Sequence, residues 1–292
     1  MPLSPLSAPS PAIIAANVAA ALVEDIGPGD LTASLIPETA QARASVITRE
    51  AGVLCGIAWF EQSFYALDNR IRIDWQAREG DVLTPDQTLC TLTGPARALL
   101  SGERTALNFL QLLSGVASKT RAYVDSVAGT KAQIVDTRKT LPGLRAAQKY
   151  AVRVGGGGNH RMALWDAILI KENHILAAGG IRPAVAAARA VAENAGGRCR
   201  FVQVEVETLA ELEAALEAGA TLLLLDNFSL PDLKEAVTRT RGRAVLEASG
   251  GLDATQLRAV AETGVDRISI GALTKHVQAL DLSMRFAEDL LP

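Results

Sequence analysis

Short apolar runs alternate with helix-like segments over the second half of the chain. The runs predict buried strands at 133–136, 167–171, 201–206, 221–226, 243–248 and 267–271. Segments with apolar residues at helical spacing follow near 144–154, 182–195, 208–218, 230–239 and 253–262. This alternation is typical of parallel strands joined by right-handed crossovers, and the last four strands begin only 20 to 24 residues apart. We therefore expect an α/β fold with an incomplete barrel of six or seven strands.

The first half of the chain has a different pattern. After an amphipathic helix at 13–24, short β-prone segments surround one helix near 58–67; they lie at 44–48, 53–57, 71–75 and 88–92. We expect residues 1–115 to form an N-terminal α+β sandwich domain and residues 116–275 to form the barrel. A long helical pattern is expected to begin at Ser101 as the N-cap and to be interrupted at Ser114-Gly115. Residues 276–292 are expected to form a helix that packs on the N-terminal domain.

Polar residues follow each predicted barrel strand. In order along the chain they are Asp136, Arg138 and Lys139; Lys171; Glu205; Asp226 and Asn227; Ser249, Gly250 and Gly251; and Gly271 and Ala272. The carboxyl ends of parallel barrel strands open on one face, where barrel enzymes hold their active sites. Glu205 and Asp226 adjoin apolar runs, and a buried carboxylate is costly unless it is paired or binds a metal. Both are expected to face cations, with structural ion pairs inside the barrel as the alternative.

Positive charge is concentrated around these strand ends. Residues 136–174 contain seven Lys or Arg against three Asp or Glu, whereas the whole chain has a net charge of −3. A local basic cluster in an acidic protein indicates a small polyanionic ligand rather than nucleic acid or a membrane. Arg145, Lys149 and Arg153 lie on one stripe of the predicted helix, and a merely solvated stripe explains them equally well.

Several other classes of protein are excluded. The three cysteines are odd in number and far apart, which argues against a disulfide framework and favours a reducing, cytoplasmic location. The longest apolar runs fall short of the ~20 residues that a membrane helix needs. Neither G-x-x-x-x-G-K-[ST] nor G-x-G-x-x-G occurs, and the three histidines lack the spacing of a zinc site. A Mg²⁺ ion held by Glu205 and Asp226 together with ligand phosphates is compatible with the sequence.

Motifs along nearly the whole chain resemble the quinolinate phosphoribosyltransferase family. They include D-T-R-K-T-L-P-G-L-R at 136–145, G-G-G-N-H-R at 156–161, L-I-K-E-N-H at 169–174, L-D-N at 225–227 and E-A-S-G-G at 247–251. The resemblance implies a decarboxylating pentosyltransferase of NAD biosynthesis that uses quinolinate, phosphoribosyl pyrophosphate and Mg²⁺. It also implies a homodimer in which the N-terminal domain of one subunit covers the barrel of the other. A nicotinate phosphoribosyltransferase, or a molybdate-transport homologue with a binding role, are the alternatives.

The resemblance also implies roles for individual residues. The two quinolinate carboxylates would be held by Arg104 of the partner subunit, Arg138, His160, Arg161 and Lys171. Phosphoribosyl pyrophosphate would be held by Thr137, Lys139, Glu205, Asp226, Ser249, Gly250, Gly251, Gly271 and Ala272. The catalytic residues would be Lys139, Lys171, Glu205 and Asp226, and the last two would bind Mg²⁺ directly or through water. Either Lys275 or His276 could contact the pyrophosphate.

Overall fold

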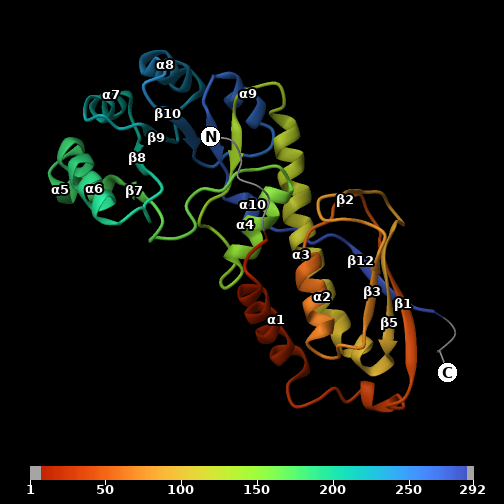
Figure 1. Ribbon diagram of the computed structural model, residues 1–292. Helices are drawn as coiled ribbons and strands as arrows, with labels where there is room; N and C mark the ends of the chain where they lie inside the picture. The colour runs from red at the N-terminus through yellow and green to blue at the C-terminus, as the bar shows by residue number, and fades with distance from the viewer. Residues whose placement is uncertain (1–7, 288–292) are drawn as a thin grey trace. The chain divides into compact units, whose positions relative to one another are not determined.

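The computed structural model describes residues 8–287, which form two compact units (Figure 1). One unit comprises residues 8–121, 141–156 and 273–287, and the other comprises residues 122–140 and 157–272. No single helix among residues 8–287 is long and apolar enough to cross a bilayer, and only a pair bent by 97°, Glu172–Ala178 with Ile181–Asn194, reaches that length and composition.

The first unit is built on a four-stranded sheet. Its order is β12 (Leu282–Phe286), β1 (Gln41–Thr48), β5 (Thr88–Pro95) and β3 (Arg72–Trp75), and all neighbouring strands are antiparallel. A two-stranded ribbon joins β2 (Gly52–Val53) to β4 (Val82–Leu83). The helices are α1 (Pro11–Ile26), η1 (Ala33–Leu35), α2 (Ile57–Tyr65), α3 (Ala96–Ser126), α4 (Arg145–Val154) and α10 (Ala272–Lys275), of which α3 and α10 each extend past the boundary between the units.

Apolar side chains of α2, α3 and the sheet share one core in this unit. Alternate residues of β1 are buried, as expected for a strand with one face against a core. Phe60 of α2 meets Phe64 and Trp75 edge-on, with ring centroids 5.1 and 5.3 Å apart. The N-terminal α+β layer architecture therefore follows the sequence pattern.

Two predictions for this unit are wrong. Helix α3 begins at Ala96 rather than Ser101 and runs unbroken for 31 residues. Ser114 stays helical because its hydroxyl forms hydrogen bonds with the backbone of Cys55. The Gln278 carbonyl packs against Gly115, where a Cβ would clash with it. The predicted C-terminal helix is replaced over 282–286 by strand β12, which pairs with the free edge of β1; residues 288–292 lie outside the described part.

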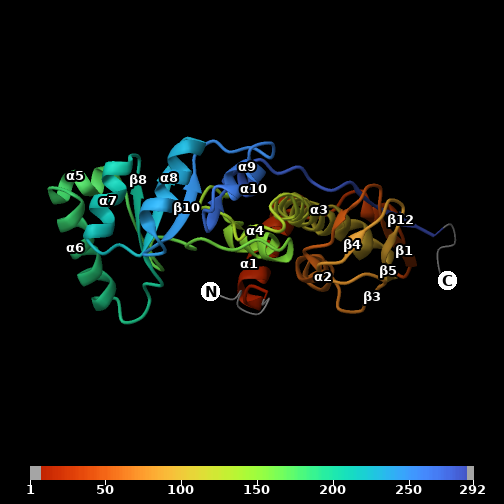
Figure 2. The same cartoon turned by 90° about the horizontal axis from the view of Figure 1, so that it is seen from above.

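The second unit contains a six-stranded parallel sheet. Its order is β6 (Gln133–Val135), β11 (Arg267–Ser269), β10 (Val245–Ser249), β9 (Leu222–Asp226), β8 (Val202–Val206) and β7 (Ile168–Ile170). Helices α5 (Glu172–Ala178), α6 (Ile181–Asn194), α7 (Leu209–Glu217), α8 (Leu230–Thr240) and α9 (Leu257–Glu262) connect the strands (Figures 1 and 2). The predicted incomplete α/β barrel is confirmed, because β6 and β7 are edges that do not pair with each other. The short helix α5 was not predicted; Gly179 and Gly180, both at positive φ, separate it from α6.

A glycine segment lies along the free edge of β6. Gly158 makes an isolated parallel bridge with Val135, donating to the Ile134 carbonyl at 2.8 Å and accepting from the Asp136 amide at 3.1 Å. A Cβ at Gly158 would come within 3.0 Å of the Gln133 side chain, so glycine allows this close approach without a shift of that side chain. This segment places His160 and Arg161 beside the strand ends.

Candidate active site

A cavity of about 390 Å³ lies at the carboxyl ends of the barrel strands. It is lined by Thr137, Arg138, Lys139, His160, Arg161, Leu169, Lys171, Glu205, Leu224, Asp226, Glu247, Ser249 and Ser269. Nine of the predicted site residues are among these, so the structure brings most of the sequence-predicted cluster together in one place. Residues far apart in the chain meet here because parallel strands all deliver their carboxyl ends to the same edge.

Lys171 and Glu205 form an ion pair inside the cavity. Lys171 follows β7 directly, and its Nζ donates to both carboxylate oxygens of Glu205 at 2.9 and 2.8 Å. Glu205 lies on β8 and is 9% exposed, so a cation partner offsets the cost of burying its charge. Asp226 differs from expectation: it is half-buried, accepts from the Asn227 side-chain Nδ2 at 2.9 Å, and makes no ion pair within residues 8–287.

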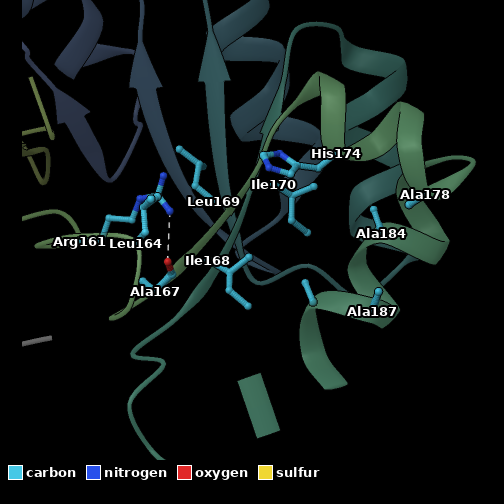
Figure 3. Close-up of a pocket in the computed structure, with 11 residues that line it drawn as sticks. Arg161, Leu164, Ala167, Ile168, Leu169, Ile170, His174, Ala178, Ala184 and Ala187 are labelled. Atoms are coloured by element: carbon cyan, nitrogen blue, oxygen red, sulfur yellow. Dashed lines mark hydrogen bonds between the residues drawn. The ribbon is translucent and has the colours of Figure 1, made fainter. Parts of the chain in front are cut away.

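Two arginines form the cationic side of the cavity. Arg161 is 7% exposed, and its guanidinium donates to the Ala167 carbonyl at 3.2 Å (Figure 3). Burial and the nearby Arg138 charge lower the pKa of Arg161, while the charges of Asp166 and Glu205 act in the opposite direction. Two like charges held close in a partly buried place favour a bound anion, which would relieve their repulsion.

A buried hydrogen-bonded cluster supports this side of the cavity. Asp136 is fully buried and accepts from the Asn159 side chain at 2.6 Å and from the His160 amide at 2.9 Å. The Arg161 amide donates to His160 Nδ1 at 2.7 Å, and His160 Nε2 lies 2.6 Å from Gln203 Oε1. Because Nδ1 accepts a hydrogen bond, Nε2 carries the proton and the ring is neutral.

The cluster continues to a carboxylate that the sequence predictions missed. Gln203 Nε2 donates to Glu247 Oε2 at 3.2 Å, and Glu247 is completely buried on β10. Burial raises the pKa of Glu247, although hydrogen bonds from Ser269 and Gln203 and the charge of Arg267 oppose the shift. Polar residues inside otherwise apolar strands were the available sequence signal for Gln203 and Glu247.

Thr137, Lys139 and Ser249 line the cavity, whereas the predicted residues Gly250, Gly251, Gly271 and Ala272 follow the strand ends without being among its lining residues. Thr137 Oγ1 accepts from the Lys139 amide at 3.0 Å. A Cβ on Gly271 would lie 2.9 Å from Lys139 Cδ, so this glycine lets the lysine side chain lie against the end of β11. Gly250 and Gly251 follow Ser249 at positive φ, and Ala272 follows Gly271. Such a surface leaves backbone groups accessible to phosphate oxygens.

Replacing Gly250 with alanine is expected to destabilise the second unit by about 1–3 kcal/mol. Gly250 has φ of +110°, and an added Cβ would lie 2.8 Å from the Asn227 backbone nitrogen, so the strand end must shift. Thermal unfolding would measure the loss. Gly197→Ala is the matched control, since Gly197 also has positive φ but has no atom within 4 Å of the added Cβ. Equal losses in both variants would contradict a special constraint at Gly250.

Other predicted residues belong to the first unit. Arg104 is exposed on α3. Lys275 ends α10 and is exposed, while the His276 carbonyl accepts from Lys119 Nζ at 2.8 Å. The basic stripe of α4 is not merely solvated, because Lys149 is fully buried.

A second pocket of about 290 Å³ lies on the outer side of β7 (Figure 3). Its wall is mostly aliphatic and comes from β7 and helices α5 and α6; Arg161 and His174 are its ionisable residues. With little polar lining, it offers less to a charged substrate than the cavity at the strand ends.

An incomplete barrel with a cation-lined cavity at its strand ends defines a class of enzyme that handles small anionic metabolites. Residues 116–285 match the family model described as quinolinate phosphoribosyl transferase, C-terminal domain, and residues 30–114 match the model of the N-terminal domain. The chain belongs to the quinolinate phosphoribosyltransferase family, as its motifs predicted.

Relatives with known names agree with this assignment. The chain is 42% identical over 262 residues to the probable nicotinate-nucleotide pyrophosphorylase [carboxylating] of Bacillus subtilis, covering 90% of this chain and 89% of that protein. It is 43% identical over 274 residues to the Mycobacterium leprae nicotinate-nucleotide pyrophosphorylase, covering 90% and 94%. The solved nicotinate-nucleotide pyrophosphorylase of Francisella tularensis superposes with a TM-score of 0.93 at 43% identity, covering 97% of this chain and 99% of that one. The predicted enzyme class, a pentosyltransferase, is confirmed.

Proposed function

We propose that this protein transfers the phosphoribosyl group of phosphoribosyl pyrophosphate to quinolinate and removes CO₂, giving nicotinate mononucleotide and pyrophosphate. The observation that carries the proposal is the meeting of Arg138, Arg161 and Lys171 in one cavity at the strand ends. Quinolinate has two carboxylates and phosphoribosyl pyrophosphate carries more charge, so both need cations when they leave water. The names of the relatives support the same reaction.

The quinolinate carboxylates would be held on the cationic side of the cavity. Arginine guanidinium groups bind carboxylates through two parallel hydrogen bonds, which suits Arg138 and Arg161. His160 is neutral and uses both ring nitrogens within the protein, so its contribution is to fix the Arg161 backbone and to pack against the substrate ring. Lys171 completes this side and pairs with the Glu205 carboxylate.

Phosphoribosyl transfer would take place on the side formed by the glycine-rich strand ends. The pyridine nitrogen attacks ribose carbon 1 as pyrophosphate leaves, and positive charge develops on the ribose. Glu205 and Asp226 stabilise that charge, while Lys139 neutralises the leaving group. Thr137, Ser249, Gly250, Gly251, Gly271 and Ala272 would hold the phosphates.

The residues present fit a Mg²⁺ ion that depends on substrate for most of its ligands. No group of three His, Cys, Asp or Glu within residues 8–287 could hold a metal by itself. Glu205 and Asp226 supply two carboxylates, which suits Mg²⁺ because it is commonly bound by one or two carboxylates together with phosphates and water. When bound, the ion would neutralise charge on the departing pyrophosphate.

Loss of CO₂ would then be assisted by the substrate itself. Alkylation makes the ring nitrogen cationic, so the electron pair left on the neighbouring carbon is stabilised by the substrate itself. No separate cofactor is required as an electron sink.

We also propose a cytoplasmic homodimer in which Arg104 of the partner subunit completes the quinolinate site. The exposed position of Arg104 on α3 supports such a role. Mixing an Arg104→Ala subunit with a subunit inactivated at Lys139 would test it: one restored site per heterodimer is expected, and no recovery of activity would contradict sharing between subunits.

The reaction is tested by supplying phosphoribosyl pyrophosphate, Mg²⁺ and either quinolinate or nicotinate to the purified protein. Release of CO₂ and pyrophosphate is expected with quinolinate only, because nicotinate would leave cations for the second carboxylate unpaired. Turnover of nicotinate alone would reject the decarboxylating assignment. Tight molybdate binding without either reaction would favour the transport-related alternative.

A further inference from the structure

Glu247 is the most deeply buried carboxylate that lines the cavity. It lies on β10 two residues before Ser249 and has no solvent-accessible surface. One oxygen, Oε2, accepts from Gln203, and the Ser269 hydroxyl also bonds the carboxylate. The other oxygen, Oε1, is buried and has no hydrogen-bond partner. A buried oxygen without a partner calls for a functional explanation when it borders a ligand cavity.

The side chains that neighbour Glu247 on the adjoining strands are mostly uncharged. His160 Nε2 lies 3.7 Å from Oε1, but the imidazole is neutral because its Nδ1 accepts a hydrogen bond. Gln203 on β8 and Leu224 on β9 carry no charge, and Ser269 and the cation Arg267 neighbour it on β11. Four further cations line the same cavity and favour the ionised form; they are Arg138, Lys139, Arg161 and Lys171. Burial outweighs the Arg267 charge and raises the pKa of Glu247. A protonated carboxyl has an O–H to donate into the cavity.

The proposed reaction requires such a donor. When CO₂ leaves ring carbon 2, the electron pair of the broken bond stays on that carbon, and a proton must replace the carboxylate. The arginines keep their protons at all ordinary pH values, Lys171 is held by Glu205, and Lys139 is assigned to the departing pyrophosphate. We propose, resting on the function proposed above, that Glu247 donates this proton and is therefore a catalytic residue.

Decarboxylation and proton transfer from Glu247 would both take place in the cavity. The bond between ring carbon 2 and its carboxyl carbon breaks, CO₂ departs, and the electron pair takes the proton of the Glu247 carboxyl to form a C–H bond. Glu247 is left as a carboxylate and regains a proton from water when nicotinate mononucleotide leaves. A neutral carboxyl beside the substrate carboxylate also favours the conversion of that charged group to uncharged CO₂.

Single turnovers of Glu247→Gln test the proposal. Glutamine keeps the shape and the bond to Gln203 but has no acidic proton, so we expect ring protonation to slow by about 100-fold. Pyrophosphate release should keep the parent rate, and quinolinate mononucleotide should accumulate before nicotinate mononucleotide appears. Glu247→Asp, which retains an acid, should recover part of the protonation rate. Glu193→Gln, an exposed glutamate on α6, is the control and should behave as the parent.

Two further measurements separate this role from a structural one. Binding of phthalate, which has both carboxylates but no ring nitrogen, should be unchanged in Glu247→Gln. In the parent, ring protonation should slow as pH rises through the pKa of Glu247 in the complex, and the glutamine variant should lack that decline. Equal slowing of pyrophosphate release and ring protonation, or an unchanged rate of both, would overturn the proposal. A parent protein that turns over no quinolinate would refute the proposed function instead.

Discussion

Replacing Arg161 with alanine is expected to lower kcat/KM for quinolinate by roughly 1,000-fold, because a substrate carboxylate would lose a buried cationic partner. Arg161 is 7% exposed and is close enough to Arg138 for the two charges to repel. Removing it relieves that repulsion, so the thermal unfolding temperature should not fall greatly. Steady-state kinetics with each substrate varied would measure the effect, together with thermal unfolding of the free protein.

The control for this variant is Arg182→Ala. Arg182 lies on α6 with a side chain that is 73% exposed, and its partner Glu217 is 3.9 Å away. Its removal takes the same charge from the chain without touching the cavity, so activity should be unchanged. A near-normal rate in Arg161→Ala would remove Arg161 from the substrate site, and equal losses in both variants would indicate a general charge effect.

Replacing Lys139 with alanine is expected to lower kcat by about 10²- to 10³-fold, since the departing pyrophosphate would lose a cation where its charge develops. The Lys139 side chain is exposed and lies against Gly271, so its loss should leave the fold intact. Because the proposed role is in the transition state, kcat should fall more than the KM for phosphoribosyl pyrophosphate rises.

Lys234→Ala provides the comparison for Lys139→Ala. Lys234 is an exposed lysine on α8, away from the strand ends, and its alanine variant should retain parent kinetics. Should Lys139→Ala turn over quinolinate at the parent rate, Lys139 has no role in pyrophosphate departure. A rise in KM alone would assign it to binding rather than to the transition state.

The sequence predicted the barrel well because its strands are buried on both faces. A run such as Leu222 to Leu225 has no competing interpretation once turn residues bound it, and all six predicted strands occur. The site was also partly predictable, since residues directly after such strands must gather at one edge. Lys171, Glu205 and Ser249 meet at the cavity for this reason.

What the sequence could not reveal depends on contacts between distant segments. Gln203 and Glu247 bond across the barrel interior, and their strands are separated by β9, so neither residue identifies the other along the chain. Ser114 and Gly115 would interrupt an isolated helix, but in α3 they are held by Cys55 and Gln278. Residues 282–286 became a strand because β1 offered an unpaired edge, a condition that local helix propensity cannot report.

The segment that contains His160 and Arg161 is joined to the edge of the sheet by an isolated backbone bridge at Gly158, so the stability of the barrel and its substrate specificity depend on different residues. The six strands are held by their own backbone hydrogen bonds, whereas His160 and Arg161 lie on a segment held by the Gly158 bridge and by hydrogen bonds to Asp136, Gln203 and the Ala167 carbonyl. Insertions or substitutions in that segment would change which acid is bound without breaking the hydrogen bonds between the strands. A new substrate specificity could therefore evolve in this fold through substitutions at a few residues while the barrel strands stay unchanged.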